Sequence, residues 1–158
     1  MAICVAERIK LRGLMDMEVI LHDGQLKPLE IDARLPSQTP TTVFHSTGVN
    51  MVSLLAELFL TGNTKIDQMK QAQTTIYEHV KVMKDNIEAM GEHIMSGVGP
   101  LKSCQGLFGA HEVITNFHPD LNEWVATLIH KGNNMEEALG RKQQTYDNIR
   151  NRVGQIAY

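Results

Sequence analysis

The chain has 158 residues, a mass of 17.7 kDa and a formal net charge of −3 at neutral pH. Hydrophobic residues make up 42% and charged residues 21%, a balance that is typical of a folded globular protein and excludes a disordered one. The slightly acidic charge gives no indication of binding to nucleic acid or to an anionic membrane surface. The length is sufficient for one domain of ordinary size.

The sequence gives no clear indication of a membrane span, a signal peptide or a disulfide. The longest apolar run, residues 51–60, is far shorter than the roughly 20 residues of a membrane span. Charged residues arrive from Glu7 onward, before the apolar core of a signal peptide could form. Cys4 and Cys104 lie far apart and show neither disulfide nor metal spacing. We therefore expect a cytoplasmic protein with no membrane and no nucleic-acid partner.

The first third of the chain predicts a helix followed by a β-hairpin. Apolar residues recur at helical spacing over residues 2–11, and Gly13 ends that pattern. Residues 14–20 and 26–33 then alternate as strands do, on either side of the turn signal Asp23-Gly24.

The length of the loop decides which side chains share a face of this hairpin. A three-residue loop, residues 22–24, places Asp16 opposite Glu30 and Glu18 opposite Pro28. All acids then lie on one face and all aliphatic residues on the other, whereas a two-residue loop would mix them. Burying one face requires the separation, so we predict the three-residue loop. Pro28 lacks a ladder donor and indicates an edge or a bulge.

The remaining patterns predict alternating helices and strands. They are a polar loop over 34–40, an apolar and therefore buried helix over 51–60, a turn over 61–64, a strand over 75–82, a helix over 85–95, a strand over 112–115, a helix over 121–130 and a last helix from Asn134. Asn134 is a good N-cap, with acids in the next turn and arginines near the end, as the helix dipole favours. The stripe of that helix is Leu139, Tyr146, Ile149, Val153 and Ile156.

The candidate functional residues lie on the predicted hairpin. Glu18, Glu30, Asp32 and Arg34 project from one face. Three carboxylates at close range repel one another unless a cation compensates, and Mg²⁺ with its preference for oxygen ligands does so well. Arg34 can hold a phosphate oxygen through its planar donor fork. These are the parts of a phosphoryl-transfer site, although a solvated face with ordinary surface charges stays open as the alternative.

Residues 12–40 resemble the metal-binding hairpin of the ATP-grasp ligases, which carry an acid or amide on one strand and E-x-N/D-x-R on the next. The pattern falls on Glu18, Glu30, Asp32 and Arg34, with Asp32 where the family usually has asparagine. The resemblance implies that Glu18, Glu30 and Asp32 bind Mg²⁺, or Mn²⁺ in its place. It also implies that Glu18, Glu30 and Arg34 contact ATP, and that Arg34 acts catalytically by steadying the transferred phosphate.

A narrower resemblance covers most of the chain. The segments EIDARLPSQTPT, STGVNMV, YEHVKV, GEHIM and GLFGAHEVIT are similar to the ligase family of pyrrolysine biosynthesis. That family joins 3-methylornithine to the ε-amine of lysine through an acyl phosphate, which makes lysine and 3-methylornithine the expected substrates. By the same resemblance, Ser37, Gln38 and Thr39 are expected to lie at the amino-acid substrate.

The resemblance also implies a fold and a domain division. We expect an α+β chain in which residues 1–60 form the second half of an ATP-grasp lid, a β-hairpin with flanking helices, and residues 61–158 form a small mixed α/β C-terminal domain. The family's N-terminal domain and the first half of its ATP lid, with a phosphate-holding lysine, would precede the part seen here. We therefore expect the isolated chain to be inactive.

Two other functional classes stay open. The chain could be a non-catalytic interaction or oligomerisation fragment that forms a homodimer through helices 51–60 and 134–157. It could also be another ATP-grasp ligase, either of the carboxylase or carbamoyl-phosphate type or a different amino-acid ligase. A histidine metal site is not expected, because His79, His93, His111, His118 and His130 show no ligand spacing. His111 and Glu112 are expected at the edge of a strand, although a place in the substrate pocket of the ligase stays open for them.

Overall fold

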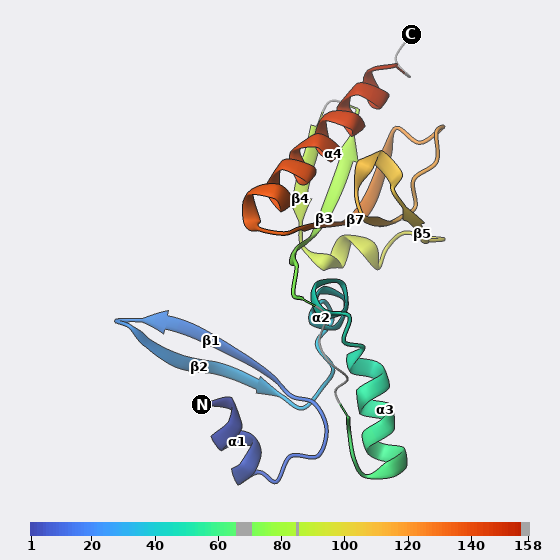
Figure 1. Cartoon of the computed structure of the whole chain (residues 1–158). Helices are drawn as coiled ribbons and strands as arrows, with labels where there is room; N and C mark the ends of the chain where they lie inside the picture. The colour runs from blue at the N-terminus through green and yellow to red at the C-terminus, as the bar shows by residue number, and fades with distance from the viewer. Residues whose placement is uncertain (66–70, 85, 156–158) are drawn as a thin grey trace. The chain divides into compact units, whose positions relative to one another are not determined.

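The computed structural model (Figure 1) describes residues 1–65, 71–84 and 86–155, with side chains as far as Arg152. The chain divides into two compact units, Met1–Lys70 and Gln71–Tyr158. Its structure is a mixture of helices and two antiparallel sheets, one in each unit, so the α+β class is confirmed.

The first unit contains the predicted helix and hairpin. Its elements are α1 (Ala2–Arg8), β1 (Asp16–His22), β2 (Gln25–Asp32), α2 (Thr39–Thr47) and α3 (Met51–Thr61). Only α2 is absent from the predicted elements, and it begins inside the stretch predicted as a polar loop. Pro40 in its first turn is a common start of a helix, because proline fits there without losing a backbone hydrogen bond.

Helix α3 forms as predicted but is not buried. The Asn50 side chain caps it by accepting a hydrogen bond from the Ser53 backbone N–H at 3.0 Å. None of its residues is buried, and Leu60 is 85% exposed. The reason is the lack of a core, since only Pro36 and His45 are buried among described residues 1–65. Sequence apolarity alone could not show this.

The ability of the described helices to span a membrane depends on their length and apolarity. None of them is by itself long and apolar enough. Taken together, α2 and α3 meet the criteria of length and composition, but the pair is bent by 101°. The bend occurs where Gly48, at φ 81°, ends α2 in the left-handed conformation.

The loop of the hairpin has two residues, so the predicted three-residue loop is wrong. His22 pairs with Gln25, which leaves only Asp23 and Gly24 in the turn. Both have positive φ angles, 50° and 71°. This turn geometry matches the twist of the flanking strands and is the commonest for short hairpins.

A bulge in β2 restores the separation of acidic from apolar side chains, which a two-residue loop with a regular register would have lost. Val19 pairs with Pro28, but the next pair is Glu18 with Glu30, so the register skips Leu29. The predicted pairing of Glu18 with Pro28 is therefore wrong. The extra residue reverses which side chains share a face beyond it. Pro28 lies directly at the irregularity, as its missing N–H indicates.

The second unit is a five-stranded antiparallel sheet with α4 packed against β3 and β7 (Figure 1). The strand order is β4-β3-β7-β6-β5. Its elements are β3 (Thr74–Met83), β4 (Asn86–Met90), η1 (Glu92–Met95), β5 (Lys102–Gln105), η2 (Leu107–Gly109), β6 (Glu112–Thr115), β7 (Glu123–Gly132) and α4 (Met135–Gln155). The predicted strands over 75–82 and 112–115 and the last helix are confirmed.

Two predicted helices of this unit are wrong. The segment 121–130 is largely the central strand β7, in which both faces are buried, so its continuous apolar run lacks the alternation of a half-exposed strand. The segment 85–95 contains strand β4 and the short 3₁₀ helix η1, and Asp85, the predicted start, lies outside the described residues. Pairing with β3 outweighs the helix-favouring composition of β4.

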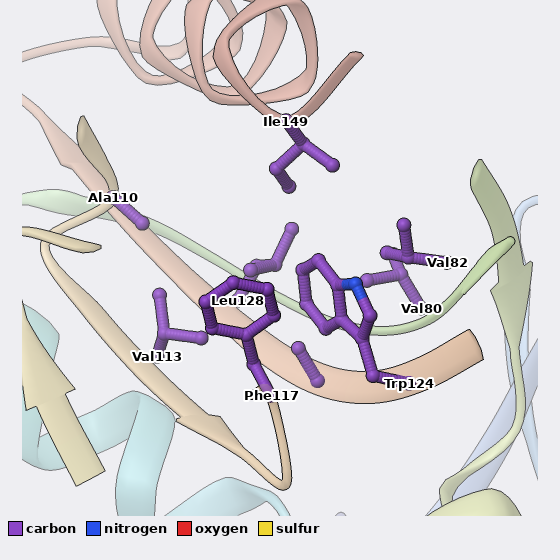
Figure 2. Packing of buried hydrophobic residues seen from close by; sticks show 9 residues of the cluster. Val80, Val82, Ala110, Val113, Phe117, Trp124, Leu128 and Ile149 are labelled. Atoms are coloured by element: carbon purple, nitrogen blue, oxygen red, sulfur yellow. The ribbon is translucent and has the colours of Figure 1, made fainter. Parts of the chain in front are cut away.

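The core of the second unit lies between the sheet and α4. Figure 2 shows Ile149 of α4 pointing toward Leu128 and Trp124 of β7. The Trp124 ring stacks on Phe108 with 5.5 Å between centroids. The predicted stripe of α4 is confirmed at buried Ile149, whereas Leu139 is 50% exposed and the side chains of Val153 and Ile156 lie outside the described part.

The junction between β7 and α4 depends on a glycine. A methyl group on Gly132 would lie 2.5 Å from the Ala138 backbone nitrogen, whereas one on Gly140, inside α4, would meet nothing within 4 Å. We expect Gly132→Ala to lower the free energy of unfolding by about 1–3 kcal/mol through overpacking. We expect Gly140→Ala, the matched control, to raise it by about 0.5–1 kcal/mol through helix propensity. Urea unfolding followed by Trp124 fluorescence measures both, and equal effects would contradict the prediction.

Candidate functional site

Four carboxylates face one another on the hairpin. In the observed register Asp16 is directly opposite Asp32, and Glu18 is directly opposite Glu30, so the predicted pairing of Asp16 with Glu30 is wrong. Alternation along each strand puts both pairs on the same side, which we call the acidic hairpin face. Side chains that pair directly in this way have Cβ atoms about 4.5–5.5 Å apart. The site residues Glu18, Glu30 and Asp32 therefore share one face, and Asp16, which was not among them, joins it.

Arg34 stands at one end of this face. Its Nε and Nη2 atoms both lie 2.9 Å from Oδ2 of Asp32. The hydrogen bond and the charge of Asp32, with smaller contributions from Asp16 and Glu30, raise the pKa of the guanidinium above its ordinary value. One guanidinium thus interacts with three of the four carboxylates. Like charges directly opposite each other destabilise a strand pair, so this positive charge offsets only part of the repulsion.

The other side of the hairpin is apolar, and we call it the apolar hairpin face. It consists of Met17, Val19, Leu21, Leu26, Pro28 and Ile31. Leu21 is 68% exposed, and Val19, Leu26 and Ile31 are exposed too. The predicted separation of acids from aliphatic residues is therefore confirmed except at Ile20, which shares the acidic hairpin face, and it results from a short loop and a bulge.

The donor set of the acidic hairpin face fits a hard divalent cation. Within the described residues, no three His, Cys, Asp or Glu side chains converge closely enough to hold a metal ion by themselves. Mg²⁺ does not require such a cage, because it is usually bound by one or two carboxylates together with phosphate oxygens and water. Two adjacent carboxylate pairs supply oxygen ligands of that kind.

The predicted substrate residues lie on the turn between β2 and α2. Ser37 is exposed in a bend, Gln38 is the N-cap residue of α2, and Thr39 is the first residue of that helix. The Gln38 carbonyl accepts hydrogen bonds from the Thr42 N–H at 3.1 Å and the Thr42 hydroxyl at 3.2 Å. The three residues therefore surround a helix N-terminus, where the dipole favours a negative group.

The histidines of the second unit have structural roles in the contacts described. His79 Nδ1 lies 2.8 Å from the Thr127 hydroxyl, and the backbone N–H of His111 donates to the Ile129 carbonyl at 2.9 Å. Glu112 is the first residue of β6, and its carboxylate accepts a 2.6 Å hydrogen bond from the Ser103 hydroxyl. The contacts of His79 and His111 are made with the central strand β7, and the contact of Glu112 joins β6 to the edge strand β5.

His130 is buried between the sheet and α4. Neither ring nitrogen has a hydrogen-bond partner among the described residues. Burial, with a smaller contribution from the Lys142 charge, lowers the pKa of His130 to about 4. The imidazole is therefore neutral at physiological pH.

This lowered pKa makes the stability of the second unit dependent on pH. The pKa of His130 is about 6.5 in the unfolded chain and about 4 in the folded protein, so between these pH values the unfolded chain binds a proton that the folded protein does not. We expect the free energy of unfolding to fall as the pH drops from 6.5 to 4, and the fall to be smaller in His130→Leu. His118→Leu, at an exposed position paired with Asp120, is the control. Urea unfolding at several pH values tests this, and equal slopes in wild type and His130→Leu would refute it.

The sequence was compared with family models and with known proteins. No family model matches it. It is 33% identical over 154 residues to the 3-methyl-D-ornithine–L-lysine ligase of Methanosarcina mazei. The ligases of the same name from Methanosarcina acetivorans and Methanosarcina barkeri are 32% and 31% identical over 151 and 153 residues.

These matches cover 95–97% of the chain but only 40–41% of each relative. The chain thus spans well under half the length of the ligases that it resembles. The resemblance seen in the motifs is confirmed by whole-chain comparison: along nearly all of its length, this chain is a relative of part of the 3-methyl-D-ornithine–L-lysine ligases.

Proposed function

We propose that the chain is part of an ATP- and Mg²⁺-dependent carboxylate–amine ligase, and that its first unit supplies the second half of an ATP-grasp lid. The observation that carries the proposal is the register that sets Asp16 against Asp32 and Glu18 against Glu30. The names of the relatives support 3-methyl-D-ornithine and L-lysine as substrates. The second unit is proposed as the small C-terminal domain of the same enzyme.

The metal would be held by the acidic hairpin face. Glu18, Glu30 and Asp32 would supply its ligands together with phosphate oxygens and water, because three such side chains do not converge by themselves in the described residues. A divalent cation there would relieve the repulsion of the paired carboxylates. Mg²⁺ bound in this way supplies charge neutralisation and orientation for nucleotide phosphates. Asp16 adds a fourth negative charge that strengthens the attraction for the cation.

Arg34 is the residue proposed to stabilise negative charge during the reaction. Its side chain is 52% exposed, and the hydrogen bonds to Asp32 occupy only part of its donor fork. The remaining N–H groups can donate to an oxygen of the transferred phosphoryl group and of the acyl phosphate. An arginine anchored by an acid in this way is already oriented when the anion arrives.

The substrate residues are proposed to act through the start of α2. Both amino-acid substrates carry a carboxylate, and the free N–H groups of a helix N-terminus attract one. Ser37 and Thr39 add hydroxyls beside Gln38. In the proposed reaction the carboxylate of 3-methylornithine would attack the γ-phosphorus of ATP, releasing ADP and forming an acyl phosphate. The ε-amine of lysine would then attack the carbonyl carbon, releasing phosphate and a proton and forming the amide.

A different ATP-grasp amino-acid ligase would use the same hairpin with other substrates. A non-catalytic interaction fragment would instead be indifferent to metal and nucleotide. Binding of a metal–nucleotide complex therefore separates the ligase classes from the interaction fragment.

The first test is metal–nucleotide binding. With ADP present and Mn²⁺ as the probe, we expect weak binding, and we expect Glu30→Gln to weaken it by about tenfold or more because it removes a ligand charge while keeping the shape. Electron paramagnetic resonance of free Mn²⁺ measures the effect. Asp23→Asn is the matched control, since Asp23 lies in the turn at the other end of the same hairpin. Equal losses in the two variants would argue against the site.

The second test concerns catalysis by these 158 residues alone. We expect no ATP-dependent release of ADP with lysine and 3-methylornithine, because the chain matches only about 40% of its relatives. Correct positioning of reactants supplies several kcal/mol in such reactions, and each 1.4 kcal/mol is a factor of about ten in rate. A coupled assay for ADP measures this, with the Methanosarcina mazei ligase as positive control. Sustained turnover by the chain would show the expectation to be wrong.

A further inference from the structure

A groove lies beside the second half of α4, within the second unit. Its volume is about 580 Å³, a size that is typical of sites for small molecules. The lining has an apolar side and a polar side. They consist of Leu107, Phe108 and Pro119, and of Asn148, Asn151 and Arg152. Because small-molecule sites combine apolar walls with a few polar groups, the groove has the composition of a binding site.

The polar side of the groove is one face of α4. Asn148, Asn151 and Arg152 are three and four positions apart, so they are neighbours on the helix surface. Among the described residues, Arg152 has no carboxylate partner, whereas Arg150 has Asp147 at 3.3 Å. The side-chain amide of Asn151 likewise makes no hydrogen bond in the part of the chain that the structure describes. The groove therefore presents a positive charge and an amide that are available to a ligand.

Phe108, on the apolar side, has an unusual backbone conformation. Its φ angle of 55° lies in the left-handed region, which residues other than glycine rarely adopt. Nδ2 of Asn148 donates a hydrogen bond to the Phe108 carbonyl at 3.0 Å, and the Phe108 ring stacks on Trp124. Backbone strain of this kind occurs preferentially at binding and catalytic sites, and here it accompanies a ring that lines the groove.

An aromatic ring holds the Arg152 guanidinium at the groove. Its Cζ atom lies 5.7 Å from the centre of the Phe117 ring, within the range of a cation–π interaction. Figure 2 shows Phe117 beside Trp124, and 4.9 Å separates their ring centroids. A cation–π contact uses none of the five N–H donors of a guanidinium as a hydrogen bond, so these donors can bind an anion.

We propose that this groove binds a small organic acid with a flat apolar body and one carboxylate. A guanidinium binds a carboxylate through two parallel hydrogen bonds, and an apolar side that includes Phe108 suits a flat ring. Among the described residues that line the groove, Arg152 is the only cation, so it matches one negative charge rather than a polyphosphate. All lining residues belong to the second unit, and the ligand is separate from the metal ion and ATP proposed for the hairpin.

Trp124 gives a local signal for the test, because it is the only tryptophan in the sequence and its ring stacks on Phe108. The probe is 2-naphthoate, added to the whole ¹⁵N-labelled chain. We expect a saturable shift of the Trp124 indole N–H resonance, with a dissociation constant of about 1 mM or below. 2-Naphthamide has the same rings without the charge and acetate has the charge without the rings, so each should bind at least about tenfold more weakly. No shift with 2-naphthoate, or equal binding of 2-naphthamide, would overturn the proposal.

Arg152 and Arg150 provide a matched pair of variants, and both are exposed, so the fold is expected to tolerate their replacement. Arg152→Gln removes the charge that lines the groove and should weaken 2-naphthoate binding by about tenfold. Arg150→Gln removes the same charge outside the groove, where salt screens it, and should change binding by less than about twofold. Arg152→Lys keeps the charge but loses the planar donor fork, so its effect should be intermediate. Equal effects of Arg152→Gln and Arg150→Gln would refute the site.

Other occupants of the groove give distinct results. A shift of the Trp124 resonance with protein concentration alone, abolished by Arg152→Gln, would assign the groove to a second copy and overturn the proposal. Tighter binding of ADP than of 2-naphthoate, followed by the same resonance, would assign it to a nucleotide and overturn it as well. Binding of 2-naphthoate that leaves the Trp124 resonance unmoved would place the acid elsewhere on the chain, with the same consequence.

Discussion

The first unit depends on a juxtaposition that is unfavourable by itself: two pairs of carboxylates set directly opposite each other on adjacent strands. A hairpin shaped for stability alone would place opposite charges there, since each cross-strand pair contributes a few tenths of a kcal/mol to about 1 kcal/mol. Arg34 compensates the end of the face nearest Asp32, where its Nε donates a hydrogen bond to that carboxylate and its Nη2 forms an ion pair with it. Glu18 and Glu30 lie two positions further along each strand, and under the proposed function a divalent cation would be their counter-charge.

The bulge at Pro28 makes this arrangement compatible with the shortest loop. Because a strand alternates with a period of two, a two-residue turn and a regular ladder would have put Glu18 opposite Leu29 and mixed charge with apolar surface. Skipping one residue shifts every later pair by one position. The same local irregularity therefore produces both the acidic hairpin face and the apolar hairpin face, and a change that removed it would affect both.

This dependence explains which features could be predicted from sequence. Alternation and the E-x-D-x-R spacing were enough to place Glu30, Asp32 and Arg34 on one side, because that inference stays within a single strand. The register between the strands could not be predicted, because it depends on the bulge. Pro28 indicates that a bulge is present but does not show which residues face each other beyond it. For β7, burial on both faces removed the alternation on which strand prediction relies. The exposure of α3 was missed because burial depends on tertiary partners, which the composition of a helix does not contain.

The two units differ in how their apolar residues are used, and this bears on mechanism. In the second unit, Ile149, Leu128 and Trp124 close a core between helix and sheet (Figure 2). The first unit has no equivalent, and its hairpin carries the proposed metal ligands on one side and exposed aliphatic residues on the other. An isolated two-stranded hairpin is at best marginally stable in water, so the order of its carboxylate pairs depends on contacts beyond the two strands.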